Sequence, residues 1–199
     1  MNITTQVENF IQRKPRGEPF TTSSMIKIGK RPAVDQALSR LTKSGEIVRI
    51  TQGVYVRPEK NRFVGIVMPE PFKVAKAIAR QSNERIQISG AEAARKMGLT
   101  TQTPAQPVFF TTGRNRHFKM GTLEISLKHV SRKKLPLPNS EAGLAIQALW
   151  HLGKEKVSIQ SIQIIQSRLT SEEFNKFVNA KNEMPGWMSN IIIQYEKEN

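Results

Sequence analysis

The pattern of apolar and polar residues predicts two helices at the start of the chain. Thr5 precedes an apolar stripe at helical spacing, and Glu8 follows it three residues later as in a capping box, so we expect a helix over residues 5–13. A break containing proline and glycine comes next. A pair of threonines can then cap a short second helix, which Gly29 would end by adopting a left-handed conformation.

A longer amphipathic helix is predicted over residues 32–44. Pro32 suits a first helical turn, where its missing N–H costs nothing, and Gly45 suits the end. One face of this helix is apolar and carries Ala33, Val34, Ala37, Leu38 and Leu41. The opposite face is polar and presents Arg31, Asp35, Gln36, Ser39, Arg40 and Lys43.

The pattern changes from helical to alternating after Gly45. Residues 46–57 place β-forming side chains on either side of Thr51, Gln52 and Gly53, which predicts a hairpin. Two helices joined by a tight turn and followed by a basic hairpin are typical of a winged helix-turn-helix, which lays one helix in the DNA major groove while its wing touches the backbone. We therefore expect DNA binding through Lys30, Arg31, Gln36, Ser39, Arg40, Lys43, Arg49 and Arg57. A solvated polar helix face and an ordinary surface hairpin are the alternatives to this interpretation.

The remainder of the chain predicts a second, mixed domain. Helices are expected over residues 72–80 and 89–97, where Ser89 and Glu92 suggest a second capping box. Strands are expected over residues 85–88 and 107–112, with a hairpin over residues 116–130 that turns at Gly121. Four more helices are expected over residues 140–152, 158–168, 171–180 and 185–196. The prediction is an α+β protein with a DNA-binding domain over residues 1–60, a second domain over residues 61–199 and a boundary at residues 57–62.

Charge adds a second candidate surface. The chain carries a net charge of +15 and has a pI near 10.4, which favours polyanionic partners. Residues 61–140 hold 14 Lys or Arg against 4 acidic residues, so the middle of the chain is its most basic part. Nucleic-acid contacts in addition to those of the first domain, to DNA or RNA, are expected from Arg114, Arg116, Lys119, Lys128, Arg132, Lys133 and Lys134. An ordinary basic surface is the alternative.

Several kinds of chemistry lack the residues they need. The chain has no cysteine, and Asp35 is its only aspartate, so thiolate sites and paired-aspartate metal sites cannot form. The three histidines are scattered, and there is no phosphate-binding Gly-rich loop. The spacing of Glu124, Ser126 and Lys128 only superficially resembles a nuclease strand. We expect no enzymatic activity, no metal and no cofactor, although a nucleic-acid-targeted nuclease without a recognisable active site remains the competing class.

The segment KRPAVDQALSRLTKSGEIVRITQGVYVRP, residues 30–58, resembles the AbiEi-type antitoxins, transcriptional regulators of type IV toxin-antitoxin and abortive-infection systems. The resemblance continues through ISGAEAARKMGLTTQTP, residues 88–104, and into the basic hairpin near Arg114. It implies a winged helix that binds repeats in its own promoter and represses the operon. It also implies a C-terminal domain that opposes a nucleotidyltransferase-like toxin, with or without direct contact.

Two further alternatives stay open. A stand-alone regulator without a cognate toxin fits the same residues, and the near-neutral C-terminal helices suit either the protein's own core or a protein partner. The sequence begins with no signal-peptide pattern, and no apolar run is long enough to cross a bilayer, so we expect a cytoplasmic protein.

Overall fold

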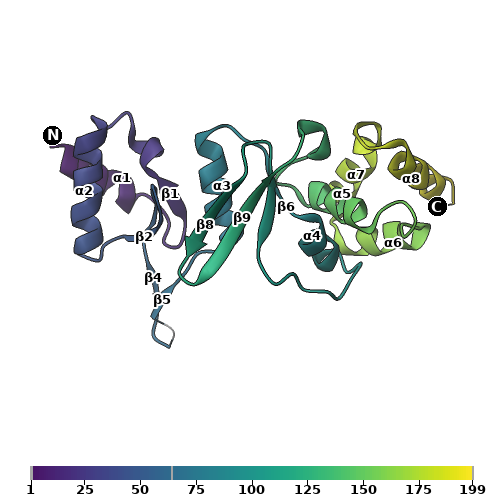
Figure 1. Cartoon of the computed structure of the whole chain (residues 1–199), viewed down its shortest axis with the longest axis horizontal. Helices are drawn as coiled ribbons and strands as arrows, with labels where there is room; N and C mark the ends of the chain where they lie inside the picture. The colour runs from purple at the N-terminus through teal and green to yellow at the C-terminus, as the bar shows by residue number, and fades with distance from the viewer. Residues whose placement is uncertain (1, 64, 199) are drawn as a thin grey trace. The chain divides into compact units, whose positions relative to one another are not determined.

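The computed structural model describes residues 2–63 and 65–198 and contains both helices and sheets (Figure 1). The mixed α+β class expected from the sequence is confirmed. The chain divides into two compact units, one of Met1–Asn83 with His117–Ile125 and one of Glu84–Arg116 with Ser126–Asn199. The first unit therefore continues past the boundary expected at residues 57–62.

The first unit is built around one small sheet. Strand β3 (Val54–Val56) lies in the centre, between β1 (Pro19–Thr21) and β2 (Val48–Thr51), and both pairings are antiparallel. The β2–β3 hairpin is the one expected from the alternating pattern. Residues 2–83 of this unit also form α1 (Ile3–Gln12), the 3₁₀ turn η1 (Thr22–Met25), α2 (Arg31–Lys43), the hairpin strands β4 (Glu59–Asn61) and β5 (Gly65–Val67), and α3 (Pro71–Gln81).

Two local predictions for this unit were wrong. The N-cap of α1 is Asn2, whose Oδ1 accepts a hydrogen bond from the Thr4 N–H at 3.3 Å, so the helix begins before the Thr5 capping box. The short second helix is a 3₁₀ turn. Pairing of β1 with β3 holds the residues before it extended, and the chain then closes with bonds such as Ile28 N–H to the Met25 carbonyl oxygen, three residues apart.

The apolar face of α2 forms the core of the first unit, as its spacing predicts. Ala33 is half-buried, whereas the other four apolar positions of that face are buried. Phe20 from β1 lies between Phe10 of α1, which meets it edge to face at 6.4 Å, and Tyr55 of β3, which stacks on it at 6.2 Å. Aromatic packing thus joins α1 to the sheet. The buried cluster comprises Val7, Ile11, Phe20, Met25, Val34, Ala37, Leu38, Leu41, Ile47 and Tyr55.

The remaining elements follow the sequence-based prediction closely. A sheet of order β6-β7-β9-β8 contains β6 (Ile86–Ile88), β7 (Val108–Thr111), β8 (Arg116–Met120) and β9 (Leu123–His129), with β7 parallel to β9. The helices are α4 (Gly90–Lys96), α5 (Glu141–Leu152), α6 (Ile159–Arg168), α7 (Ser171–Asn179) and α8 (Gly186–Glu198). Two 3₁₀ turns, η2 (Arg132–Lys134) and η3 (Ala180–Glu183), complete the described elements.

The capping box expected at the start of α4 is absent. Ser89 is the N-cap residue, but its side chain makes no capping hydrogen bond. Glu92 instead pairs with Arg95 at 2.7 Å between Oε1 and Nη2, and this hydrogen bond holds the pKa of Glu92 below its usual value. The Ser89 N–H, which a capping box would use, donates instead to the Val108 carbonyl oxygen at 3.1 Å.

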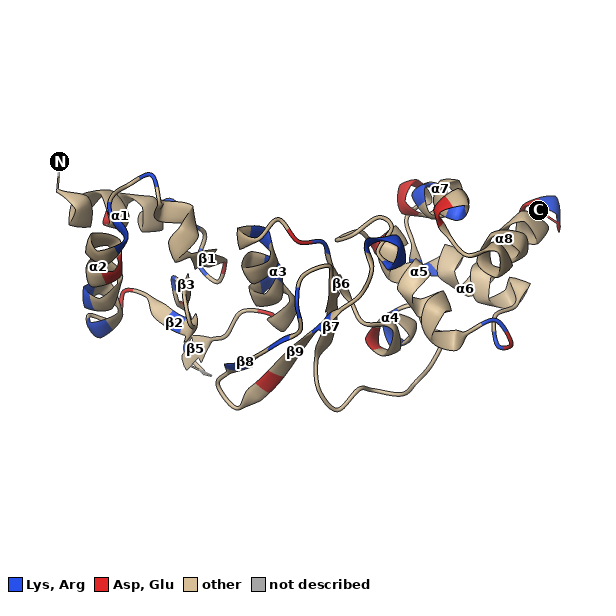
Figure 2. Cartoon of the chain, turned by 45° about the horizontal axis from the view of Figure 1, so that its top comes forward, with Lys and Arg blue, Asp and Glu red and all other residues tan. Residues whose placement is uncertain are grey.

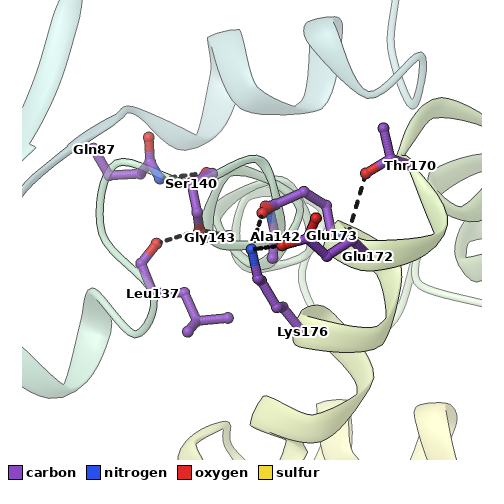
Figure 3. Close-up of polar contacts among 9 residues, drawn as sticks. All are labelled: Gln87, Leu137, Ser140, Ala142, Gly143, Thr170, Glu172, Glu173 and Lys176. Atoms are coloured by element: carbon purple, nitrogen blue, oxygen red, sulfur yellow. Dashed lines mark hydrogen bonds and ion pairs between the residues drawn. The ribbon is translucent and has the colours of Figure 1, made fainter.

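Helix α5 is the centre of the second unit, and its first turn is held by polar contacts (Figure 3). The Ser140 hydroxyl accepts a hydrogen bond from the Gly143 N–H at 2.9 Å and donates one to the Leu137 carbonyl at 2.7 Å. Glu173 of α7 accepts a hydrogen bond from the Ala142 N–H at 2.9 Å. The carboxylate therefore satisfies a helix N–H that has no partner within the helix and lies at the favourable end of the helix dipole.

The two tryptophans pack against each other. Trp150 of α5 and Trp187 of α8 meet edge to face with ring centroids 6.2 Å apart, and both are half-buried. This edge-to-face contact packs α5 against α8.

Candidate nucleic-acid interface

Helix α2 presents one continuous polar face to solvent. Its sequence buries Val34, Leu38 and Leu41 on the side that packs in the core. The 3.6-residue period then turns the intervening positions outward. Six of the eight predicted DNA contacts lie on this face or just before it, and all six are exposed: Lys30, Arg31, Gln36, Ser39, Arg40 and Lys43.

A groove of about 510 Å³ lies between α2 and the β2–β3 hairpin. Figure 2 shows basic segments on both of these elements. Backbone geometry shapes the hairpin side, because Gly53 has a φ of +73° and permits a tight turn between the strands. The lining residues are Thr22, Arg31, Asp35, Ser39, Thr42, Lys43, Arg49, Gln52, Gly53 and Tyr55.

Four of the eight predicted contacts line this groove: Arg31, Ser39, Lys43 and Arg49. Lys30, Gln36 and Arg40 lie exposed outside its lining, on the outer side of α2 or before it. The structure thus brings together one edge of the helix and the hairpin, with a hydroxyl, cations and amides available for hydrogen bonding.

Arg57 has a different place. Its Nη1 donates to the carbonyl oxygens of Gln12 at 2.7 Å and Lys14 at 2.9 Å, so the guanidinium ties the end of β3 to the last turn of α1 and the loop after it. The bond to Gln12 satisfies a carbonyl that the helix end leaves without an internal partner, and the bond to Lys14 holds the loop that follows. Arg57 therefore has a structural role that its position beside the hairpin did not predict.

One carboxylate lies among the cations of the groove. Arg31 Nε is 3.0 Å from Asp35 Oδ2 and 3.1 Å from Oδ1, one helical turn away, and both side chains are largely exposed. A pair of this kind contributes little to stability, because solvent screens it. It keeps the Arg31 guanidinium beside Asp35 in the lining of the groove.

Sequence reasoning missed two residues of this surface. Gln52 lines the groove from the hairpin turn, and its place before Gly53 was a usable signal. Ile26, in the turn between η1 and α2, is 77% exposed and lies beside the exposed Lys27. An apolar side chain exposed at this place carries no sequence signal, because its periodicity matches that of a core residue.

The middle basic residues do not all share one environment. Arg116 pairs closely with Glu84, which also accepts a hydrogen bond from the Thr111 hydroxyl at 2.7 Å. The Nζ atom of Lys134 lies 5.1 Å from the ring centre of Trp150, a cation–π contact. The predicted residues that remain exposed are Arg114, Lys119, Lys128, Arg132 and Lys133.

Other candidate chemistry is sparse in the part of the chain that the structure describes. Across residues 2–63 and 65–198, no group of three or more His, Asp or Glu side chains could hold a metal ion. His129, one of the scattered histidines, has Nδ1 2.8 Å from the Gly113 carbonyl oxygen. Among the same residues, no helix combines the length and apolarity needed to span a bilayer.

The sequence matches the model of a known family. Residues 6–177 fit the model of DUF6088, a family of unknown function, and this span covers most of the chain. The protein therefore belongs to the DUF6088 family. No curated protein matches the sequence.

Proposed function

For this member of a family of unknown function, we propose that the first unit binds double-stranded DNA as a winged helix-turn-helix. In this proposal η1 and the following turn take the place of the positioning helix, α2 enters the major groove, and the β2–β3 hairpin is the wing. Such modules lay the recognition helix in the major groove, where its exposed side chains meet base edges.

The observation that carries the proposal is the groove of about 510 Å³ between α2 and the hairpin. Its cations come from two separate elements, Arg31 and Lys43 from α2 and Arg49 from β2, while Gln52 comes from the hairpin turn. A DNA backbone that follows the groove would meet positive charge on both sides. The phosphate contacts would supply affinity and fix the orientation of the helix.

The exposed side chains of α2 suit base recognition. Arg40 can donate two parallel hydrogen bonds to guanine, and Gln36 can make a bidentate pair with adenine. Both are exposed and lie outside the groove lining. In the proposed orientation, the outer part of α2 carries sequence selectivity, and the groove residues carry most of the phosphate contacts.

The resemblance of residues 30–58 and 88–104 to AbiEi-type antitoxins suggests what DNA binding does in the cell. We propose that the protein represses its own operon by binding repeated promoter sites and that it counteracts a nucleotidyltransferase-like toxin. The exposed cations of the middle cluster, such as Lys128 and Arg132, would lengthen the nucleic-acid footprint. Rescue of growth during co-expression with a toxin gene encoded beside it tests the antitoxin part separately.

The test of DNA binding uses the purified full chain and two duplexes, the DNA upstream of its own gene and a scrambled duplex of equal composition. Tighter binding to the upstream duplex at moderate salt is expected, and Arg40→Ala should reduce that preference. Lys154→Ala, which removes an exposed cation in the loop after α5, is the matched control. Equal and salt-labile binding to both duplexes would contradict a selective regulator.

A further inference from the structure

The β4–β5 hairpin exposes an unusual amount of apolar surface. Phe63, Ile66 and Met68 are 79%, 47% and 42% exposed, within one short stretch of chain. Among the described residues, the two strands pair only with each other. A two-stranded hairpin has no core of its own, so this apolar surface stabilises nothing within the hairpin.

The hairpin is nevertheless anchored at its base. Pro58 and Pro69 flank it, and both are buried. Arg16 Nη1 donates to the Pro58 carbonyl at 3.0 Å, and the Gly17 N–H donates to the Arg57 carbonyl at the same distance. Figure 1 shows β4 and β5 extending away from α1, α2 and the β1-β3-β2 sheet. The structure therefore holds a fixed arm with an apolar, exposed end.

Cations accompany the apolar side chains on this arm. Lys60 is paired across the strands with Ile66, so the two share one face of the hairpin. Near the tip, the Arg62 guanidinium carbon lies 4.5 Å from the ring centre of Phe63. The Asn61 side chain accepts a hydrogen bond from the Phe63 N–H at 2.8 Å and so orients the backbone beneath the ring.

We propose that the β4–β5 hairpin is a second DNA-contacting arm, which inserts Phe63 at a base step of the minor groove while Lys60 and Arg62 contact phosphates. The inference rests on the proposed DNA binding of the first unit. Proteins that bind the minor groove frequently use an apolar wedge of this kind, flanked by cations, to unstack and kink the duplex. The arm follows the proposed wing directly, because only Arg57 and Pro58 separate β3 from β4.

Charge favours DNA over a second copy of the chain as the occupant. Lys60 and Arg62 outnumber Glu59 on the hairpin, so a contact between two such hairpins would bring together two surfaces of net positive charge, and their repulsion would oppose association. A duplex instead offers phosphates to the cations and stacked bases to the ring. An anionic lipid surface would also offer negative charge to the cations and an apolar layer to the ring, and vesicle binding distinguishes it from DNA.

The experiment uses the full-length protein and its upstream duplex, in which a fluorescent adenine analogue that brightens on unstacking occupies each step in turn. Wild-type protein should increase emission at one step. Phe63→Ala should abolish that increase and weaken binding about tenfold. Changing Lys60 and Arg62 together to alanine should lower the slope of log affinity against log salt by roughly 0.9 for each phosphate that the variant no longer neutralises.

Two controls test whether the effects of Phe63→Ala arise from the hairpin itself and not from a general loss of apolar surface or of folding. Ile193→Ala removes an exposed apolar side chain from α8 and should change neither emission nor affinity. Thermal unfolding should show that Phe63→Ala folds as the wild type does, since its ring is exposed.

Three results would overturn the proposal in distinguishable ways. Unchanged emission and affinity for Phe63→Ala, with weaker binding by Arg40→Ala, would exclude the proposed role of the β4–β5 hairpin. The proposed DNA-binding function of the first unit would stand. Failure of the wild type to bind any duplex would exclude both the role of the hairpin and the DNA-binding function of the first unit. Binding to phosphatidylglycerol vesicles that Phe63→Ala loses, with duplex binding unchanged, would assign the arm to lipid.

Discussion

Arg31 Nε lies 3.0 Å from Asp35 Oδ2 across one turn of α2, and the pair lines the groove between this helix and the β2–β3 hairpin. Asp35 is the only aspartate in the chain. Its carboxylate repels phosphates but can orient the Arg31 guanidinium or accept a hydrogen bond from cytosine. The position of this acid therefore suits selectivity more than affinity.

Replacing Asp35 with alanine should tighten binding to random duplex DNA by a few-fold, because one negative charge leaves a surface that faces phosphates. Preference for the upstream duplex should fall at the same time. Competition binding at two salt concentrations measures both effects. Glu155→Ala removes an exposed acid elsewhere and is the control; an equal gain with that variant would assign the effect to net charge alone.

Alanine variants of Arg57 and Arg49 should differ in their effects, the first on stability and the second on DNA binding. Arg57→Ala leaves the Gln12 and Lys14 carbonyls without their guanidinium partner and should lower the free energy of unfolding by about 1–3 kcal/mol. Arg49→Ala removes an exposed groove cation and should leave stability nearly unchanged while weakening DNA binding. Urea unfolding and salt-dependent binding of both variants check this division. A stable Arg57→Ala protein would contradict the structural role.

Gly143 should not tolerate a side chain. A Cβ atom there would lie 2.0 Å from the Leu137 carbonyl oxygen and 2.9 Å from Gln87 Nε2. Gly143→Ala should therefore destabilise the second unit by about 1–3 kcal/mol or more, since the backbone must shift to relieve the overlap.

Gly186 provides the matched control for this substitution. It lies in the first turn of α8, and nothing is within 4 Å of its added Cβ. Gly186→Ala should be neutral or stabilise by up to about 1 kcal/mol, because alanine loses less backbone entropy on folding. Chemical unfolding compares the two variants, and equal destabilisation by both would contradict the packing described at the start of α5.

Glu173 should contribute to the dependence of stability on pH. Hydrogen bonds from the Lys176 side chain and then from the Ala142 N–H hold the pKa of Glu173 below its ordinary value of 4.5, and the pKa of Lys176 is raised by its hydrogen bonds to Glu172 and Glu173. A carboxyl whose pKa is lower in the folded state stabilises the protein above its unfolded pKa. The contribution disappears as pH falls from 4.5 through the folded pKa.

Glu173→Gln should therefore be less stable than the wild type at pH 7, and the difference should shrink below pH 4.5. Urea midpoints measured at neutral and acidic pH test this. Glu172→Gln keeps the bond between Glu173 and Ala142 and should show a smaller pH-dependent difference. A difference for Glu173→Gln that stays constant with pH would exclude this origin.

Local sequence signals predicted most helices and strands but few of the contacts between residues distant in sequence. Helix α2 followed from Pro32, Gly45 and a clear apolar face, and the β8–β9 hairpin followed from alternation around Gly121. Strand β1 was missed because it has three residues and forms only through pairing with β3, more than thirty residues later. Its formation also explains why a 3₁₀ turn replaces the expected second helix.

The candidate interface shows the same division between local and distant information. Periodicity placed Gln36 and Arg40 on the exposed face of α2. It could not show that Arg57 binds the carbonyls at the end of α1 or that Arg116 pairs with Glu84, because both partners are distant in sequence. The exposed β4–β5 hairpin was also missed, since its apolar residues look like those of a buried strand.

Protection of guanine N7 atoms from methylation tests the placement of α2 most directly, because N7 faces the major groove. The proposal predicts a short run of protected guanines in the upstream duplex with wild-type protein, and loss of protection at one position with Arg40→Ala. Binding without any N7 protection would contradict it, because the protein would then hold DNA without α2 in the major groove.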